Sequence, residues 1–227
     1  MNWSDIFYPE NPKSRENLIR KSQEVLELMK NNFRATNQLI EVLQEHLGLH
    51  FSPVKVNEKA TVKENCDVLI ERIREIQVEV GKIDRELKEE LDPALYEKLR
   101  RKDLSIPERK KVLTVLRGVH CCVATLASAY IVGWLFQNAT MLANITGVCG
   151  VIAKGLIGCV VFGVLFMGAD MIFQAILGYF ERDELERALK DYDNVLEDFR
   201  PESVKYQDSI TEVKVIIRIM LKKNMFS

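Results

Sequence analysis

The feature that most constrains this chain is an apolar run from residue 119 to residue 180. Over these 62 residues only Lys154 and Asp170 carry a firm charge, and the run holds eight of the eleven glycines and none of the six prolines. A bilayer hydrocarbon core of ~30 Å is crossed by about 20 apolar residues in a helix. The run is therefore long enough for one generous membrane crossing or for two tight ones.

The rest of the chain is strongly charged but nearly balanced. It carries 63 of the 65 charged side chains, and the net charge is −1. This balance argues against nucleic acid as a partner. Residues 1–13 contain acids and prolines but no apolar core, so we expect no cleaved signal peptide, and any insertion would use the internal run.

Apolar residues outside the run recur at helical spacing, which predicts an all-α fold. The first helix is expected from Asn11 to about Leu47, with Gly48 just past its end. The second is expected from near Val62 to Leu91. Its apolar seam alternates steps of four and three: Val62, Cys66, Leu69, Ile73, Ile76, Val80, Ile83 and Leu87.

Sustained heptads with charged flanks favour coiled-coil packing. We therefore expect residues 1–104 to form an N-terminal coiled-coil hairpin, antiparallel across the loop at 48–61. Pairing with another copy of the chain or with a partner coiled coil is the alternative. Residues 181–227 are expected to form further amphipathic helices, interrupted at Pro201.

Residues 105–180 are expected to form the membrane region, as one transmembrane helix or a helical hairpin. A capping box, Ser105 with Glu108, begins the preceding helix. Two apolar helices are predicted at about 119–136 and 147–178, with the polar decapeptide 137–146 as the turn. Small residues let helices approach closely in lipid: Ala129, Gly133, Gly147, Gly150, Gly155 and Gly158.

Two charged residues fall inside this membrane region. Asp170 would either make a polar contact inside a bundle or pore or lie hydrated at the membrane edge, and we favour the edge. Fifteen residues separate it from Lys154, about 22 Å of helix, too far for a salt bridge on one straight helix. Both side chains could then reach opposite faces of a thinned bilayer.

Several cysteines and asparagines are candidates for covalent modification. The five cysteines are expected to be reduced. Cys121 and Cys122 are candidates for lipidation, although packed small residues are the favoured interpretation. Asn138 and Asn144 match the glycosylation pattern but are expected to be unmodified so close to a bilayer.

No motif points to catalysis, a cofactor or a small-molecule substrate. His46 and His50 have the spacing of metal ligands on a helix, but Gly48 lies between them and no third ligand is evident, so no metal site is expected. Basic residues are denser before the apolar run than after it, which predicts an integral membrane protein whose N-terminal half is cytoplasmic.

Several short segments resemble one family, the single-pass membrane and coiled-coil domain-containing protein 3 family of vertebrates. The resembling segments are Tyr8 to Lys13, Thr36-Asn37, Glu41 to Leu43, His46 to Gly48, Lys63 to Asp67, Leu95-Tyr96, Lys98-Leu99, Asp170 to Ile172 and Ala175 to Gly178. The resemblance implies a membrane segment near 150–175 and no activity. The family name implies one crossing, whereas Cys121 to Phe136 is apolar enough here to count separately.

Three functions remain open at this point. The first is a non-enzymatic, membrane-anchored coiled-coil protein that tethers or scaffolds partners. The second is a membrane-active protein whose apolar hairpin inserts conditionally to perforate or remodel a bilayer. The third is a soluble bundle with the hairpin as its core. The expected partners are a lipid bilayer and a second or partner coiled coil.

Overall fold

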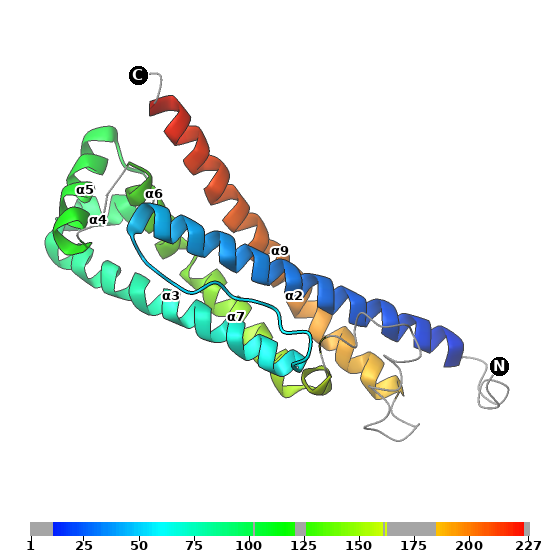
Figure 1. Ribbon diagram of the computed structural model, residues 1–227. Helices are drawn as coiled ribbons and strands as arrows, with labels where there is room; N and C mark the ends of the chain where they lie inside the picture. Colours follow the sequence, from blue (N-terminus) through cyan, green and yellow to red (C-terminus); the bar gives the residue numbers. More distant parts are fainter. Residues whose placement is uncertain (1–10, 102, 121–125, 161, 163–184, 225–227) are drawn as a thin grey trace. The chain divides into compact units, whose positions relative to one another are not determined.

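The computed structural model describes residues 11–101, 103–120, 126–160, 162 and 185–224. This part of the chain is helical, apart from its connections and one isolated β-bridge at Thr61 (Figure 1). The predicted all-α class is therefore confirmed. The helices are α2 (Asn11–Leu47), α3 (Val62–Glu90), α4 (Pro93–Arg100), α5 (Ile106–His120), α6 (Leu126–Gln137), α7 (Ala139–Lys154), the 3-10 helix η1 (Leu156–Cys159) and α9 (Leu185–Asn224).

The chain divides into two compact units. The first contains residues 1–33, 55–70 and 145–204, and the second contains residues 34–54, 71–144 and 205–227. Helices α2, α3 and α9 begin in the first unit and end in the second, whereas α7 begins in the second and ends in the first. Each long helix therefore contributes to both units.

Helices α2 and α3 have the extents that their sequences predict. α2 ends at Leu47, and Gly48 follows with a φ of 67°, a conformation that glycine adopts without a Cβ clash. All eight residues of the predicted α3 seam are buried, from Val62 at 0% to Val80 at 7% exposure. Removal of this apolar stripe from water holds α3 in place.

The connection between α2 and α3 differs from the prediction. The Asn37 side chain donates to Val54 O at 2.9 Å and accepts from Val54 N at 2.8 Å, so the chain runs back along α2. This connection returns from the second unit to the first before α3 begins. The predicted antiparallel hairpin is therefore not formed.

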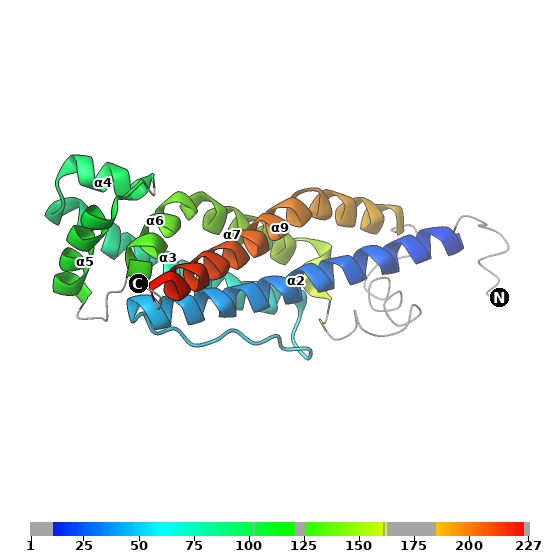
Figure 2. The ribbon, with the colours of Figure 1, turned by 90° about the horizontal axis from the view of Figure 1, so that it is seen from above.

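In the second unit, α4 and α5 both pack against α6 (Figure 2). The rings of Tyr96 and Phe136 are 6.5 Å apart, and Gln137 Nε2 donates to Arg100 O at 2.6 Å. At the start of α5, the Ser105 backbone N donates to Glu108 Oε2 at 2.9 Å, which confirms the predicted pairing of these two residues.

The apolar region breaks at a different place from the one predicted. Instead of a turn over 137–146, only Asn138 separates α6 from α7, where its side chain donates to Trp134 O at 2.8 Å. The polar residues fit a helix because they lie on its outer side: Thr140 is exposed and Asn144 and Thr146 are half-buried. The inner side is apolar and buried: Met141, Leu142, Ile145, Cys149 and Ile152.

The second apolar helix also ends earlier than the predicted residue 178. α7 stops at Lys154 because Gly155 is extended, with φ −83° and ψ 178°. After η1, Val62 N donates to Val160 O at 2.8 Å and Phe162 N donates to Ala60 O at 2.7 Å, which ties this segment to the start of α3. Residues 163–178 lie outside the described part, as do 121–125 of the predicted helix 119–136.

The predicted break at Pro201 is wrong, because α9 continues through it. The buried seam keeps its spacing across this position, from Phe199 to Ser203 and then Tyr206, each 0% exposed. Pro201 itself is exposed, and its missing amide removes one bond on the outer side of the helix. Packing of the inner side therefore outweighs the proline.

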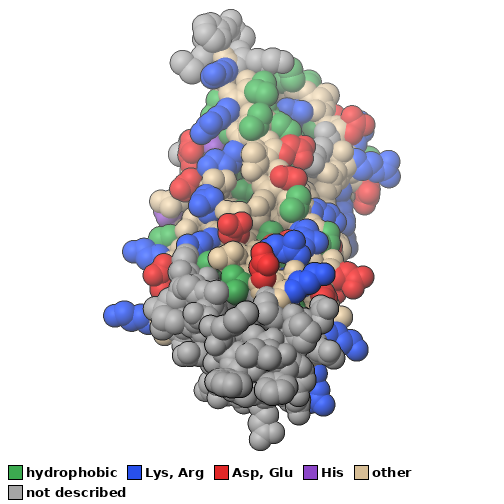
Figure 3. Space-filling model, turned by 90° about the vertical axis from the view of Figure 1, so that its right-hand side faces the viewer, with side chains coloured by type: hydrophobic (Ala, Val, Ile, Leu, Met, Phe, Trp, Pro, Cys, Tyr) green, Lys and Arg blue, Asp and Glu red, His purple; other side chains and the backbone are tan. Residues whose placement is uncertain are grey.

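No single helix among the described residues is long and apolar enough to cross a bilayer. Residues Ala127–Gln137 and Ala139–Lys154 reach the required length and composition only as a pair, and the pair is bent by 53°. From Ala127 to Phe136 every residue is buried except the half-buried Tyr130. On the face drawn in Figure 3, the described surface instead shows acidic and basic side chains interspersed.

Candidate functional site

The most regular polar feature is a set of buried contacts between α2 and α9. In the first unit, Asn32 Nδ2 donates to Ser203 Oγ at 2.9 Å, and both residues are 0% exposed. Two exposed ion pairs join the same helices there, Lys21 with Asp193 and Arg200 with Glu24. The buried bond between Asn32 and Ser203 is the important contact, because exposed ion pairs contribute little to stability.

In the second unit, the same two helices form another polar pair. Thr36 Oγ1 and Tyr206 Oη are 2.7 Å apart, and both residues are 0% exposed. Lys214 Nζ lies 3.5 Å from Glu41 Oε2 nearby. A buried hydroxyl is costly unless it is hydrogen-bonded, so this pair disfavours any alignment that separates Thr36 from Tyr206.

All five of these contacts share one alignment. The partners are between 170 and 176 residues apart in every pair, in the first unit and in the second. A nearly constant separation means that α2 and α9 run parallel within each unit, in one register. Buried polar residues at seam positions select such a register, as in coiled coils.

Sequence reasoning missed this pairing, although part of its signal was present. Ser203 lies at the seam position between Phe199 and Tyr206, but a search for apolar residues at helical spacing passes over a serine. The same search passes over Asn32, which lies next to Phe33. The partner of α2 had no local signal, because it lies more than 170 residues away.

A third buried hydroxyl lies on the same seam in the first unit. Tyr192 is 1% exposed, and its hydroxyl has no hydrogen bond of ordinary geometry among the described residues. Burial raises the pKa of Tyr192 to about 12, opposed only by the nearby Ser22 hydroxyl. Ser22 Oγ donates instead to Leu18 O at 2.8 Å. Tyr192 thus contributes packing rather than a specific polar contact.

Two thiols meet inside the first unit. Cys66 of α3 and Cys149 of α7 are both 0% exposed, and a hydrogen bond between them, together with burial, raises the pKa of the Cys66 thiol strongly. A raised pKa keeps the thiol protonated, and a protonated thiol is a poor nucleophile and metal ligand. Cys159 is exposed and separate from this pair.

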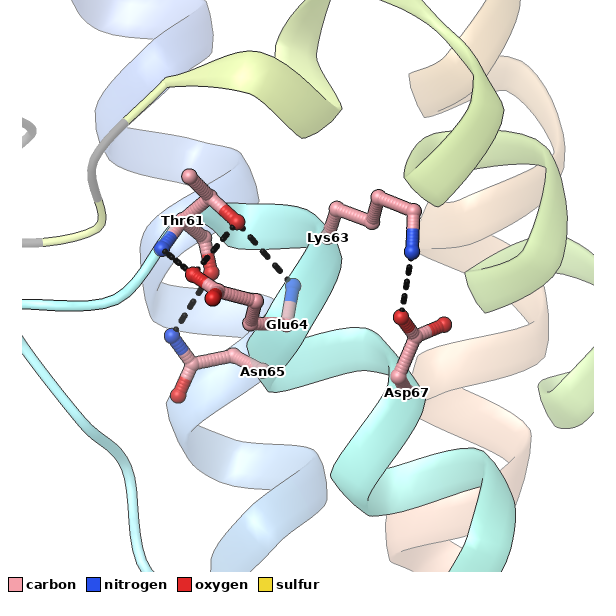
Figure 4. Close-up of polar contacts among 5 residues, drawn as sticks. All are labelled: Thr61, Lys63, Glu64, Asn65 and Asp67. Atoms are coloured by element: carbon pink, nitrogen blue, oxygen red, sulfur yellow. Dashed lines mark hydrogen bonds and ion pairs between the residues drawn. The ribbon is translucent and has the colours of Figure 1, made fainter.

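The start of α3 carries a cluster of polar side chains (Figure 4). Thr61 N donates to Glu64 Oε2 at 2.7 Å, and Glu64 N donates to Thr61 Oγ1 at 3.2 Å. The hydrogen bonds that the Glu64 carboxylate accepts from the Thr61 backbone amide and hydroxyl lower the pKa of Glu64. Lys63 is likewise paired with Asp67, at 2.6 Å. The cluster is a capping box that satisfies the free amides of the helix, and its groups already bind one another.

Two hollows lie in the second unit, and both are small. One, of about 200 Å³, is bordered by Gly81, Asp84, Arg100, Phe136 and Leu142 among others. The other, of about 220 Å³, is bordered by residues of α2 and α9 that include His46. Pockets for small-molecule ligands are roughly 300–1,000 Å³. Neither hollow has the size expected of a cofactor site.

The predicted site residues are only partly within the described part. Lys154 is exposed in the last turn of α7, where a cation suits the helix C-terminus. An added Cβ at Gly147 or Gly150 would meet no atom within 4 Å, and at Gly155 the nearest would be 3.6 Å away. At Gly158 it would lie 2.6 Å from Ala153 O, so glycine is required by the turn after α7 and not by contact with another helix.

The remaining predicted residues are not brought into one site. Asp170, Cys121 and Cys122 lie outside the described residues. His46 is buried at the end of α2 and His50 is exposed, and no group of three metal-ligating side chains occurs among the described residues. Burial lowers the pKa of His46, opposed by Glu45.

Comparison with known proteins places the chain in one family. Residues 14–174 match a family described as "Protein of unknown function (DUF4533)", and this match covers more than half of the chain. The chain belongs to the DUF4533 family. The matched DUF4533 region includes α2 from residue 14 onward, the helices from α3 to η1, and the apolar run as far as residue 174. No solved structure matches this chain.

Proposed function

We propose that this member of the DUF4533 family is a non-enzymatic helical scaffold attached to a membrane. The observation that supports it is the burial of the first part of the apolar run. Helix α6 is almost wholly buried, and α7 buries its apolar side. The part of the run left to contact lipid is then 163–180, which contains one charge, Asp170, in 18 residues.

The pairing of α2 with α9 supports the scaffold part of this proposal. Two parallel helices in one register, with buried hydrogen bonds on the seam, form a stiff element in each unit. Their outer sides carry exposed charges of both signs, for example Asp193 and Arg200. Such surfaces suit protein partners better than a small substrate. The resemblance to a single-pass coiled-coil membrane family fits the same function.

Membrane attachment through 163–180 can be tested by alkaline carbonate extraction of the full-length protein from cells. We expect the native protein to remain in the membrane pellet and a variant with Ile172→Arg and Ile176→Arg to be extracted. Val151→Arg is the matched control, because Val151 is 61% exposed on α7 and should leave attachment unchanged. Complete extraction of the native protein would overturn the proposal.

A second candidate function is conditional membrane insertion by α6 and α7. It is favoured by the bent pair Ala127–Gln137 and Ala139–Lys154, which has the length and composition of a span. In this case Val151→Arg should impair membrane attachment, and the purified protein should release dye from liposomes. If no dye is released at any pH or lipid composition, the result would count against conditional insertion.

Labelling of engineered cysteines separates the two topologies. The exposed positions Glu27, Thr140 and Glu212 sample α2, the start of α7 and α9. Attachment by 163–180 as a single crossing places Glu212 on the opposite side from Glu27 and Thr140. Insertion as a hairpin leaves all of the flanking helices on one side. Comparison of intact and permeabilised cells distinguishes these patterns.

A further inference from the structure

The last turns of α9 expose apolar side chains away from the protein interior. Val215 and Ile219 are 48% and 49% exposed and are one turn apart. The inner side of the same turns is buried, with Val213 at 0% and Ile217 at 3% exposure. At 100° per residue, Val215 and Ile219 point opposite to this buried seam. They therefore face away from the buried seam of α9.

The charged residues of α9 that follow Glu212 have one sign. After Glu212 the sequence contains no further acid and four basic residues, Lys214, Arg218, Lys222 and Lys223. Arg218 and Lys222 are exposed, whereas Lys214 is half-buried beside Glu41. In Figure 3, hydrophobic and basic side chains lie together just below the grey residues at the top, at the C-terminal end. We call Val215, Arg218, Ile219 and Lys222 the C-terminal face.

The exposed apolar residues of α3 have different surroundings from those of the C-terminal face. Val68 and Val78 are 44% and 58% exposed, but Val68 follows Asp67 and Val78 precedes Glu79. Isolated exposed valines among mixed charges are common on protein surfaces. The C-terminal face joins two aliphatic side chains to Arg218 and Lys222, and the acids near it are Glu212, one turn before Val215, and Glu41 and Glu45 of α2, which border a hollow with Arg218. The outer end of the face, beyond Arg218, carries cations beside aliphatic side chains, which suits an anionic, partly apolar partner.

We propose that the C-terminal face docks on an anionic membrane surface. Helices that lie in a bilayer interface place aliphatic residues among the acyl chains and long basic side chains at the headgroups. A second copy is a poor occupant, because two such faces would bring like charges together. The inference deepens the proposed membrane attachment, since it adds a surface contact distinct from the segment 163–180.

The test uses the full-length protein with a single added tryptophan. Ile219→Trp is reconstituted in vesicles of phosphatidylcholine with or without phosphatidylserine, and the parent spectrum is subtracted to remove Trp3 and Trp134. We expect a blue shift and quenching by brominated lipid with phosphatidylserine, weakened at high salt. Val78→Trp is the matched control and should show no change. Circular dichroism checks that each variant is folded.

Charge reversal then tests the role of the cations. Arg218→Glu with Lys222→Glu should lower the docked-to-undocked ratio by ~30-fold or more, whereas Lys222→Arg should retain docking. An equal shift in neutral vesicles, or no shift in either, would overturn the inference. A shift that depends on protein concentration without vesicles would show self-association instead and would also overturn it.

The two membrane proposals can fail separately. The Arg218→Glu and Lys222→Glu variant should remain in the carbonate pellet, because extraction depends on 163–180. A native protein that is fully extracted by carbonate but still shows the shift at Ile219→Trp would retain this inference and remove the proposed anchor. A native protein that stays in the carbonate pellet but shows no shift at Ile219→Trp would retain the proposed anchor and remove the docking face.

Discussion

Thr36 of α2 and Tyr206 of α9 share a hydrogen bond of 2.7 Å, although 170 residues separate them in the chain. Both residues are 0% exposed, so neither hydroxyl can exchange this contact for bulk water without local opening. Earlier in α9, Tyr192 is also buried, at 1% exposure, but its hydroxyl lacks such a bond among the described residues. The two tyrosines therefore separate the effect of packing from that of hydrogen bonding.

We expect Tyr206→Phe to lower the free energy of unfolding by ~1–2 kcal/mol, because it deprives the buried Thr36 hydroxyl of this bond. Tyr192→Phe keeps the ring and should change stability by less than ~0.5 kcal/mol. Urea denaturation of both variants and the parent provides the measurement. An equal loss in the two variants would contradict a structural role for the Thr36 bond.

Pro201 lies inside α9 and is exposed. Pro201→Ala restores one backbone hydrogen bond without disturbing the buried seam, so it should raise the free energy of unfolding by ~1–3 kcal/mol. Asp198→Ala, an exposed neighbour on the same helix, serves as the control and should have little effect. If Pro201→Ala is neutral or destabilising, α9 is not one continuous helix at this point.

His46 should make stability depend on pH. Burial lowers its pKa below the ordinary value of 6.5, so the unfolded chain takes up a proton at a higher pH than the folded chain. The free energy of unfolding is therefore highest above about pH 6.5 and falls as the pH drops toward the folded pKa. His46→Gln should reduce this slope, whereas the exposed His50→Gln should retain it. Identical slopes in all three proteins would exclude His46 as the source.

Cys66 and Cys149 should resist alkylation in the folded protein. Both thiols are 0% exposed, and the raised pKa of Cys66 keeps its thiol protonated. The exposed Cys159 is the control and should react with N-ethylmaleimide without denaturant. Mass spectrometry of peptides labelled with and without urea provides the measurement, and Cys66 and Cys149 should be labelled only in urea. Labelling of Cys66 or Cys149 in the folded protein as fast as that of Cys159 would show that the two thiols are not buried together.

Sequence periodicity predicted the helices well where one side is apolar and the other charged. The eight seam residues of α3 and the end of α2 at Leu47 followed from local spacing and from Gly48 alone. The prediction was wrong where the same residue type is compatible with two kinds of local structure. Asn138 and Thr140 resemble a turn but lie at a bend and on an outer helical side, and Gly155 resembles a packing residue but ends α7.

The candidate site could be predicted less well than the helices. The pairing of Asn32 with Ser203 depends on a match between distant segments, and no local pattern encodes it. The direction of the 48–61 connection depends on Asn37, one amide among many in α2. Sequence reasoning located the apolar run, but it could not decide which part of the run packs against protein.

The large separation between α2 and its partner also affects how the protein can be made. On the ribosome, α2 emerges long before α9 is translated, so the two helices cannot associate until synthesis is almost complete. In the meantime the apolar side of α2 must be covered by α3, by a chaperone or by transient non-native contacts. Closure over so many residues predicts slow assembly of a protein whose individual helices form quickly.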